Sequence, residues 1–396
     1  MLKKISASEL KVGMYVDSII QKSSTLKISQ QGFISSDSIL KKLKDSGVVY
    51  AIIDTDKSQN ESEPDKPESI KEEAPKRTRK SSASLSGRLK AASKLYEEAR
   101  TLQAQALSNI KEGKKLNVEP LNHMAEALID SIFDDQDTLL CVSQMRNKDS
   151  YLLEHSINVS ILMTVFANHL KYPRTIIQQL AVGGLLHDIG KIKVPDSILN
   201  KPGRLTQEEF EEMKRHVEYG IAEVQDIADI SDISMQVIAM HHEKLDGSGY
   251  PKGLKGNEIT PFGRIASIVD IFDALTGERS YKKGIVHVRA LKMLMEQKEL
   301  LDMGMVEQFI KCIGVHPVGS IVLLKSGKLG IVTRSNPDSP LKPLVKTFYS
   351  AKHRHFLEIK EVDLASKFCE DEIEKSVKAE EFGINFQHFF NEQFVA

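Results

Sequence analysis

A histidine and an aspartate stand side by side in residues 185–191, which read Leu-Leu-His-Asp-Ile-Gly-Lys, and this pair constrains the fold more than any other feature. Imidazole nitrogens suit transition metals such as iron, and a carboxylate can bridge two cations. A single His-Asp pair more often serves in capping or in a salt bridge. Here further candidate ligands lie in or beside apolar, helix-like runs: His155, His216, His241, His242 and Asp270. The sequence therefore predicts helices that gather these side chains around metal.

The segment that follows residue 149 is predicted to be almost wholly helical. Apolar residues recur every four positions at Leu153, Ile157, Ile161 and Val165, which is typical of a helix that buries one face. Further helices are expected at 176–186, 234–242 and 265–275. Successive residues on a helix point about 100° apart. His241 and His242 can therefore reach two metal ions, or one ion from two sides.

Two details refine this helical segment. Thr206 followed by Glu209 forms a capping box, which predicts a helix that carries His216 on its third turn. Gly220, four residues after His216, permits a close approach of helices. A carboxylate in the apolar run 265–275 is costly to bury without a cation or hydrogen-bond donors. Asp270 is therefore expected to face one of these.

The rest of the chain is divided by composition. Residues 1–56 are predicted to form a small α/β module, with strands at 12–16 and 48–53 and a helix at 36–46. Residues 57–84 are rich in Pro, Ser, Glu and Lys and predict a disordered linker. Helices are expected at 85–110 and 120–145, so residues 85–129 connect the module to a catalytic domain at 130–325.

After Pro317 the pattern changes to that of strands. Residues 318–324 and 329–332, separated by Ser-Gly-Lys, predict a β-hairpin, and 344–363 predict further strands. Residues 326–396 then form a β extension with an acidic and aromatic tail. That tail is expected to dock on the body of the protein through Phe382, Phe386, Phe389, Phe390 and Phe394. The fold class is mainly α, with a small α/β module before the helical domain and a short β extension after it.

Composition excludes several classes of protein. The formal net charge of −1 gives no reason to expect a nucleic acid polymer as partner. No run of about 18 apolar residues and no signal-peptide pattern is present, so no membrane span is expected. The cysteines, Cys141, Cys312 and Cys369, are far apart and odd in number, which argues against disulfides and thiolate metal sites. These features favour the reducing cytoplasm.

Taken together, the motifs resemble the HD-GYP family of cyclic-dinucleotide phosphodiesterases. The resemblance covers roughly residues 130–325 and rests on motifs found in the family's order and spacing: His187-Asp188 with Lys191, His216 with Gly220, His241-His242-Glu243, Asp246-Gly247-Ser248-Gly249-Tyr250-Pro251, and Asp270. Residues 1–140 resemble, more loosely, a domain of unknown function that often precedes HD-GYP domains. The resemblance implies a helical HD-type metallohydrolase fold.

The resemblance also implies roles for residues. The ligands of two divalent metal ions, commonly iron or manganese, would be His155, His187, Asp188, His216, His241, His242 and Asp270, with Asp188 as the bridge. Lys191 would contact the scissile phosphate, Arg279 and Lys282 would hold the remaining phosphate and guanine groups, and Gly249, Tyr250 and Pro251 would shape the adjacent loop. Some members bind a third metal through a Glu four residues before the first His. Tyr151 stands there, and Glu154 points elsewhere, so two metals are expected.

The chemistry of phosphodiester hydrolysis agrees with these roles. Two cations supply a nucleophile at neutral pH and clamp the phosphate, while Lys191 adds a charge where negative charge develops. No Ser or Cys nucleophile with an adjacent base stands out, which favours direct attack by hydroxide. Asp188 and Lys191 are therefore the expected catalytic residues.

The implied reaction is hydrolysis of cyclic di-GMP to linear pGpG and further to GMP. Three alternatives stay open. The substrate can be another cyclic dinucleotide, such as 3',3'-cyclic GMP-AMP. A mononucleotide is less compatible with the loop at 249–251. The protein can also be a non-catalytic sensor or a docking partner of diguanylate cyclase domains, although an intact ligand set argues against this. A homodimer is a further candidate assembly.

Overall fold

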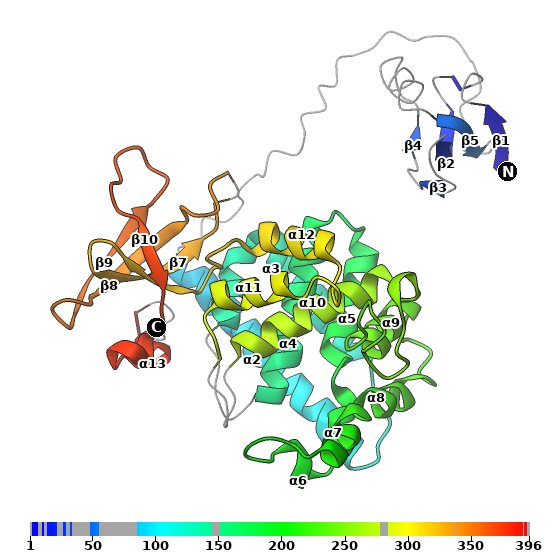
Figure 1. The fold of residues 1–396 in the computed structure, drawn as a ribbon, viewed down its shortest axis with the longest axis horizontal. Helices are drawn as coiled ribbons and strands as arrows, with labels where there is room; N and C mark the ends of the chain where they lie inside the picture. Colours follow the sequence, from blue (N-terminus) through cyan, green and yellow to red (C-terminus); the bar gives the residue numbers. More distant parts are fainter. Residues whose placement is uncertain are drawn as a thin grey trace. The chain divides into compact units, whose positions relative to one another are not determined.

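We describe the protein from a computed structural model (Figure 1). The described residues are 2–6, 10–11, 14–21, 27–28, 32–33, 48–54, 85–144, 151–277, 284–336, 338–390 and 392–393. The chain divides into two compact units, Met1–Thr78 and Arg79–Ala396. The helix predicted at 36–46 and the linker predicted at 57–84 lie outside the described residues.

The described part of the N-terminal unit is an antiparallel sheet. Its strands are β1 (Leu2–Ser6), β2 (Tyr15–Gln21), β3 (Lys27–Ile28), β4 (Gly32–Phe33) and β5 (Val48–Asp54). The spatial order is β1-β5-β2-β3, and β4 also pairs with β2. Side chains from its strands pack with Leu10 in a small core, made of Ile5, Leu10, Val16, Ala51 and Ile53. The strand expected at 48–53 is confirmed. Of the strand expected at 12–16, Tyr15 and Val16 lie in β2, Met14 precedes it, and residues 12–13 lie outside the described residues.

The larger unit is built around a helical domain, which confirms the mainly α fold. Its helices are α2 (Leu85–Lys111), α3 (Glu119–Ser143), α4 (Tyr151–His169), α5 (Arg174–Leu186), η3 (Ile189–Lys193), α6 (Asp196–Leu199), α7 (Gln207–Lys214), α8 (His216–Val224), α9 (Asp232–Met240), η4 (Gly256–Glu258), α10 (Pro261–Thr276), α11 (His287–Glu296) and α12 (Met303–Ile313). None of the helices in the described part of the chain combines the length and hydrophobicity needed to cross a membrane.

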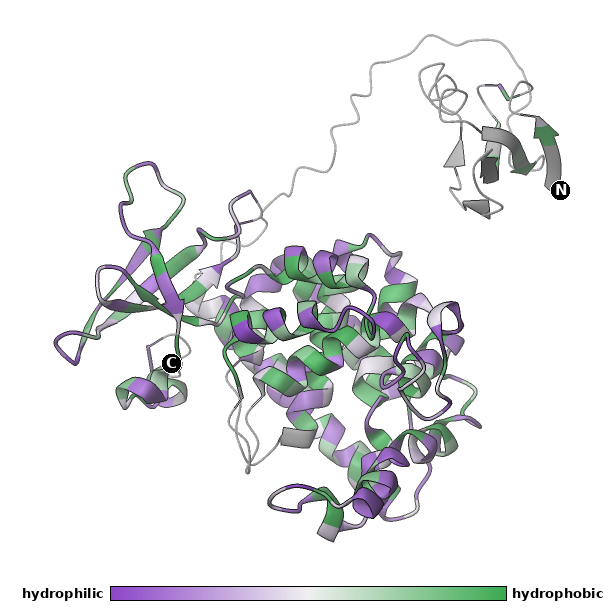
Figure 2. Cartoon of the chain, viewed as in Figure 1, coloured by the Kyte–Doolittle hydropathy of each residue, from purple (hydrophilic) through white to green (hydrophobic). Residues whose placement is uncertain are grey.

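Helix α4 is central to this domain, and it packs against α3, α5 and α10 (Figure 1). Hydrophobic residues concentrate on the inner helices, whereas α7 at the rim is largely hydrophilic (Figure 2). The axes of α4 and α5 approach closely, because a Cβ added to Gly184 would lie 2.7 Å from Ser160 Cα. Of the predicted stripe, Ile157, Ile161 and Val165 are buried, and Leu153 is partly buried. Close packing of these helices therefore fixes the positions of the side chains at their ends.

The capping box at Thr206 is confirmed, but the helix that it begins is shorter than expected. The Thr206 side chain accepts a hydrogen bond from Glu209 N, and the Glu209 side chain accepts one from Thr206 N. Helix α7 ends at Lys214, and His216 is the first residue of a separate helix, α8, instead of lying on the third turn of α7. The break lets α8 pack against η3, the short helix that follows Asp188.

The β extension is a second antiparallel sheet, ordered β10-β6-β7-β8-β9. Its strands are β6 (Ile321–Leu324), β7 (Lys328–Arg334), β8 (Leu344–Ser350), β9 (His355–Asp363) and β10 (Ile373–Ser376). The hairpin and the strands at 344–363 are confirmed. Strand β10 was not expected, because four residues of mixed polarity carry no recognisable alternation. Its pairing with β6 completes the sheet.

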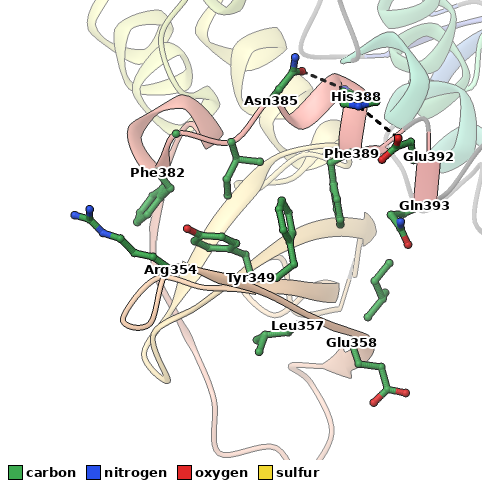
Figure 3. Close-up of a pocket in the computed structure, with 14 residues that line it drawn as sticks. Tyr349, Arg354, Leu357, Glu358, Phe382, Asn385, His388, Phe389, Glu392 and Gln393 are labelled. Atoms are coloured by element: carbon green, nitrogen blue, oxygen red, sulfur yellow. Dashed lines mark hydrogen bonds and ion pairs between the residues drawn. The ribbon is translucent and has the colours of Figure 1, made fainter.

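The aromatic tail docks on this sheet, through η5 (Ala379–Phe382) and α13 (Phe386–Phe390) (Figure 3). Phe389 stacks on Phe356 of β9 with ring centroids 4.9 Å apart and planes 15° apart. Phe390 is 1% exposed and belongs to the main core. The expected docking on the body is therefore confirmed for these residues, while Phe394 lies outside the described residues.

Candidate metal centre

The helices bring together all seven side chains that the sequence nominated as ligands. His155 lies on α4, His187 and Asp188 lie between α5 and η3, and His216 opens α8. His241 and His242 follow the end of α9, and Asp270 lies on α10. Six of them are buried, and the His242 side chain is 22% exposed. The centre is thus an interior site with one accessible edge.

Asp188 lies between two groups of histidines. Its Oδ2 lies 3.4 Å from His155 Nε2 and 3.3 Å from His187 Nε2. Its Oδ1 lies 3.4 Å from His216 Nε2 and 3.8 Å from His241 Nε2. The donors form two groups that share Asp188, and in each group the ligand atoms lie within 4.8 Å of one another. These groups are His155, His187 and Asp188, and Asp188, His216, His241 and His242. One carboxylate therefore faces two adjacent subsites, which we call the His155 subsite and the His216 subsite.

Asp270 lies close to histidines of both subsites. Its Oδ1 lies 3.0 Å from His155 Nε2 and 3.8 Å from His187 Nε2. Its Oδ2 lies 3.6 Å from His242 Nδ1. The expectation that this buried carboxylate faces a cation or donors is met by the histidines around it.

The imidazole rings are held with Nε2 directed to the centre. The Nδ1 atoms of His187, His216 and His241 lie 2.8, 2.7 and 2.8 Å from the carbonyl oxygens of Gly184, Met213 and Ile238. A carbonyl can only accept, so Nδ1 carries the hydrogen and the Nε2 lone pair points inward. Main-chain acceptors of this kind orient metal-binding histidines in many proteins.

These donors fit divalent metal ions. Lone pairs of neutral imidazoles converge with two carboxylates, and the Nε2 atoms of His216 and His241 lie only 3.3 Å apart. Asp188 Oδ1 is buried and has no hydrogen-bond partner among the described residues. A buried acceptor without a partner is costly. A cation at each subsite would satisfy both the lone pairs and this oxygen.

The protonation states agree with a ligand set. Burial lowers the pKa of His216 to about 4 and that of His241 to about 3. Burial would raise the pKa of Asp188, but the Lys191 ammonium and His187 outweigh it and hold this pKa well below its usual value. Metal binds neutral imidazole and ionised carboxylate. At neutral pH these groups already have the required charge.

His155 differs, because a carboxylate lies at each ring nitrogen. Burial acts to lower its pKa, but hydrogen bonds with Asp270 and Asp273 outweigh burial and raise the pKa to about 9. Without metal, His155 therefore holds a proton between the two carboxylates. A metal ion would take the place of the proton at Nε2.

Close backbone packing fixes η3 against α8. A Cβ added to Gly190 would lie 2.0 Å from His216 O and 2.3 Å from Gly220 N. A Cβ added to Gly220 would meet nothing closer than 3.5 Å. The tight contact predicted at Gly220 is thus real, but Gly190 is the position that cannot accept a side chain. It sets the distance between Asp188 and His216.

Lys191 lies beside the centre, on η3. Its Nζ is 2.5 Å from Asp188 Oδ2, and its side chain is 17% exposed. The ammonium therefore lies beside the predicted bridging ligand, and its contact with the scissile phosphate stays a prediction. Arg279 and Lys282, the residues expected to hold the rest of the substrate, lie outside the described residues.

The loop at 243–251 borders the accessible edge. The Tyr250 ring lies 4.6 Å from the His242 ring, centroid to centroid, and the Tyr250–Pro251 bond is cis. A Cβ added to Gly249 would lie 2.4 Å from Lys244 N, so the loop folds back tightly on itself. Gly249, Tyr250 and Pro251 are thus placed next to a predicted ligand.

Two buried carboxylates of this region received no role from the sequence. Asp273 Oδ2 lies 2.7 Å from His155 Nδ1. The Glu243 carboxylate accepts hydrogen bonds from Lys252 N at 2.8 Å and Leu254 N at 2.9 Å, and it holds the loop. The signal for Asp273 was its position three residues after Asp270 in the same apolar run. Glu154 is buried, and its carboxylate lies 3.7 Å from Arg100 Nε of α2.

Three models of known protein families match successive parts of this chain. A model of the HD domain matches residues 139–304, and a domain of unknown function (DUF3391) matches 2–121. A KOW domain associated with the HD domain matches residues 321–381, a likeness that the sequence patterns of the β extension did not reveal.

Relatives with curated functions include three phosphodiesterases. The chain is 31% identical over 374 residues to a cyclic di-GMP phosphodiesterase of Pseudomonas aeruginosa, which covers 92% of this chain and 89% of that protein. It is 37% identical over 154 residues to a cyclic di-GMP phosphodiesterase of Thermotoga maritima (39% and 41% covered). It is 46% identical over 114 residues to a 3'3'-cGAMP-specific phosphodiesterase of Vibrio cholerae (28% and 22% covered).

The match to the Pseudomonas protein extends over nearly the whole of both chains, and the HD motif lies at the centre of the buried donor cluster. The chain therefore belongs to the HD-GYP family of cyclic di-GMP phosphodiesterases, and a domain of unknown function (DUF3391) precedes its HD domain.

Proposed function

We propose that this protein is a metal-dependent phosphodiesterase that hydrolyses cyclic di-GMP to linear pGpG and, in a second cut, to GMP. The observation that carries the proposal is Asp188, whose two oxygens face two separate groups of histidines. A carboxylate shared in this way is suited to bridge two ions, the arrangement used for in-line phosphoryl chemistry. The full-length similarity to a cyclic di-GMP phosphodiesterase supports the substrate.

We assign the seven donors to two divalent ions. His155, His187 and Asp270 would hold one ion with Asp188 Oδ2, and His216, His241 and His242 would hold the other with Asp188 Oδ1. A mixed set of nitrogen and oxygen donors without thiolate favours iron or manganese. When bound, the two ions supply an activated water and stabilise charge on the phosphate oxygens.

The chain's own residues supply binding and charge around the ions. Lys191 places an ammonium beside Asp188, where negative charge on the scissile phosphate develops. Tyr250, with Gly249 and Pro251, shapes the wall next to His242. Arg279 and Lys282 are assigned to the remaining phosphate and the guanine groups.

The organisation of the whole chain is part of the proposal. We infer that residues 1–56 form the N-terminal module, 57–84 a linker, 85–129 connecting helices, 130–325 the catalytic domain and 326–396 the β extension with its tail. Strand β6, at the end of the catalytic range, pairs with β7 and β10 of the extension. We place the enzyme in the cytoplasm, because three cysteines far apart in the sequence favour a reducing compartment. Diguanylate cyclase domains and a second copy of the chain are the proposed partners.

A second candidate substrate is 3',3'-cyclic GMP-AMP. The similarity to a Vibrio cholerae enzyme named as specific for that molecule reaches 46% identity, although over only 114 residues. Both substrates offer the same phosphodiester to the metal centre, so the choice between them depends on contacts to the second base.

The test is turnover of a substrate panel by anaerobically purified, full-length protein. We expect hydrolysis of cyclic di-GMP, with pGpG appearing before GMP, and slower or no hydrolysis of 3',3'-cyclic GMP-AMP and of mononucleotides. Faster turnover of cyclic GMP-AMP would establish the second candidate. Binding of cyclic di-GMP without turnover, in protein that holds its metals, would show a sensor in place of an enzyme.

A further inference from the structure

The outward ring nitrogen of His155 meets a different kind of partner from those of the neighbouring histidines. In His187, His216 and His241 this atom faces a main-chain carbonyl oxygen. In His155 it lies 2.7 Å from Oδ2 of Asp273, a carboxylate with 0% exposure. A carbonyl carries a partial charge, whereas an ionised carboxylate carries a full one.

Helix geometry explains why Asp273 reaches this position. Residues three apart on a helix lie on the same face. Asp270 and Asp273 of α10 therefore both face α4, and they bracket the His155 ring, with Asp270 Oδ1 3.0 Å from Nε2. A carboxylate behind a ligating imidazole fixes the tautomer and the ring orientation, and it makes the imidazole a stronger donor.

The same arrangement makes the two subsites electrostatically unequal. Asp188 is shared between them. The His155 subsite adds Asp270 Oδ1, 3.0 Å from His155 Nε2, and Asp273, while the Lys191 ammonium lies 2.5 Å from Asp188 Oδ2. The His216 subsite adds three imidazoles, and Asp270 Oδ2 lies 3.6 Å from one of them, at His242 Nδ1. The His155 subsite thus has more carboxylate oxygens close to its imidazoles than the His216 subsite has.

We propose that Asp273 is a positioning residue for the metal centre, which orients and polarises His155 and makes the His155 subsite the tighter of the two. This inference rests on the ligand assignment of the proposed function. It adds a residue outside that ligand set and an order of filling, the His155 subsite before the His216 subsite.

The first test needs no substitution. Full-length wild-type protein is stripped with a chelator and titrated with Mn²⁺, and bound metal is followed by the loss of the free-ion electron paramagnetic resonance signal. We expect two resolved binding steps of unequal affinity. Two steps of equal affinity, or a single step, would overturn the proposed inequality of the subsites.

The second test uses Asp273→Asn, which keeps the shape of the side chain and an oxygen that can accept from His155 but removes the charge. We expect the tighter step to weaken about 10- to 100-fold, the range found for such outer partners, while the weaker step changes little. Asp137→Asn, the same change at a half-buried carboxylate of α3, is the matched control and should leave both steps as in wild type.

A double-mutant cycle then shows whether Asp273 acts through His155. His155→Ala should remove the tighter step, and adding Asp273→Asn to it should have no further effect on metal binding. An equal additional loss in the double variant would show that Asp273 acts by another route. Wild-type affinities in Asp273→Asn would show that it only fills space. These titrations contain no nucleotide, so they stay informative even if cyclic di-GMP is not the substrate.

Discussion

The contact between Gly190 and the start of α8 gives a sharp prediction about the metal centre. The change is Gly190→Ala, a single added methyl group. At that position the new Cβ would lie 2.0 Å from His216 O, 2.3 Å from Gly220 N and 2.9 Å from Gly220 Cα. All three atoms belong to the backbone, so no side chain can rotate out of the way. Helix η3 must therefore move away from α8 by more than an ångström.

The expected cost follows from this displacement. Overpacking a tight interior typically costs 1–3 kcal/mol, and a clash with backbone belongs at the upper end, so we expect a loss of about 2–3 kcal/mol in the free energy of unfolding. The displacement also separates Asp188 Oδ1 from His216 Nε2, which are 3.4 Å apart. The amount of metal bound at the His216 subsite should therefore fall.

The assay combines urea unfolding with metal analysis of the purified variant. Gly220→Ala is the matched control, because it adds the same methyl group on the other side of the same contact, with nothing closer than 3.5 Å. It should be neutral or stabilising, since alanine is favoured over glycine within a helix by about 1 kcal/mol. Wild-type stability and metal content in Gly190→Ala, or an equal loss in Gly220→Ala, would refute the reasoning.

Three further changes probe charge at and away from the centre. Lys191→Ala should lower kcat by roughly ten- to a thousand-fold with metal content preserved, and Lys191→Arg should restore kcat only in part. Lys193→Ala, on the same short helix, is the control and should leave kcat unchanged. Turnover by Lys191→Ala within twofold of wild type would remove Lys191 from the mechanism. Arg279→Ala should raise KM while metal content stays intact, whereas Arg289→Ala, at an exposed position, should leave KM unchanged. Wild-type kinetics in Arg279→Ala would exclude Arg279 from substrate binding. Burial, and then the charge of Asp135, raise the pKa of Asp137 to about 6, so the ionised form destabilises the fold and stability falls as pH rises from about 4 to about 6. Asp137→Asn should therefore raise the free energy of unfolding in urea by about 1–2 kcal/mol at pH 7.5 and leave it unchanged at pH 3.5. An equal increase at both pH values would contradict the raised pKa of Asp137.

The parts of the fold that the sequence predicted are those with strong local patterns. The stripe through Ile157, Ile161 and Val165 marked a buried helix, and the capping box at Thr206 marked the start of another. Strand β10 has four residues and gains its place only by pairing with β6, so no local signal announces it. Helix α7 ends before His216 because α8 packs against η3, and such a contact between distant segments also leaves no local signal.

In the site, too, the residues with a strong local signal were predicted and those placed by packing were not. The seven predicted ligands are recognisable because adjacent pairs such as His187-Asp188 and His241-His242 are unusual within apolar helices. Asp273 is separated from His155 by 118 positions, and only the packing of α10 on α4 brings them together. Glu243 binds main-chain N–H groups of its own loop, and such contacts leave no trace in residue type. Gly190 was not singled out, because its constraint is the nearness of another backbone.

The central claim is that Asp188 joins two metal subsites, and a metal count tests it most directly. Wild-type protein purified without oxygen and analysed for metals should contain about two iron or manganese ions per chain. Asp188→Ala should lose metal at both subsites and lose hydrolysis with it, because the same carboxylate serves each ion. Zero or one tightly bound ion in fully active wild-type protein, or wild-type turnover by Asp188→Ala, would contradict the account.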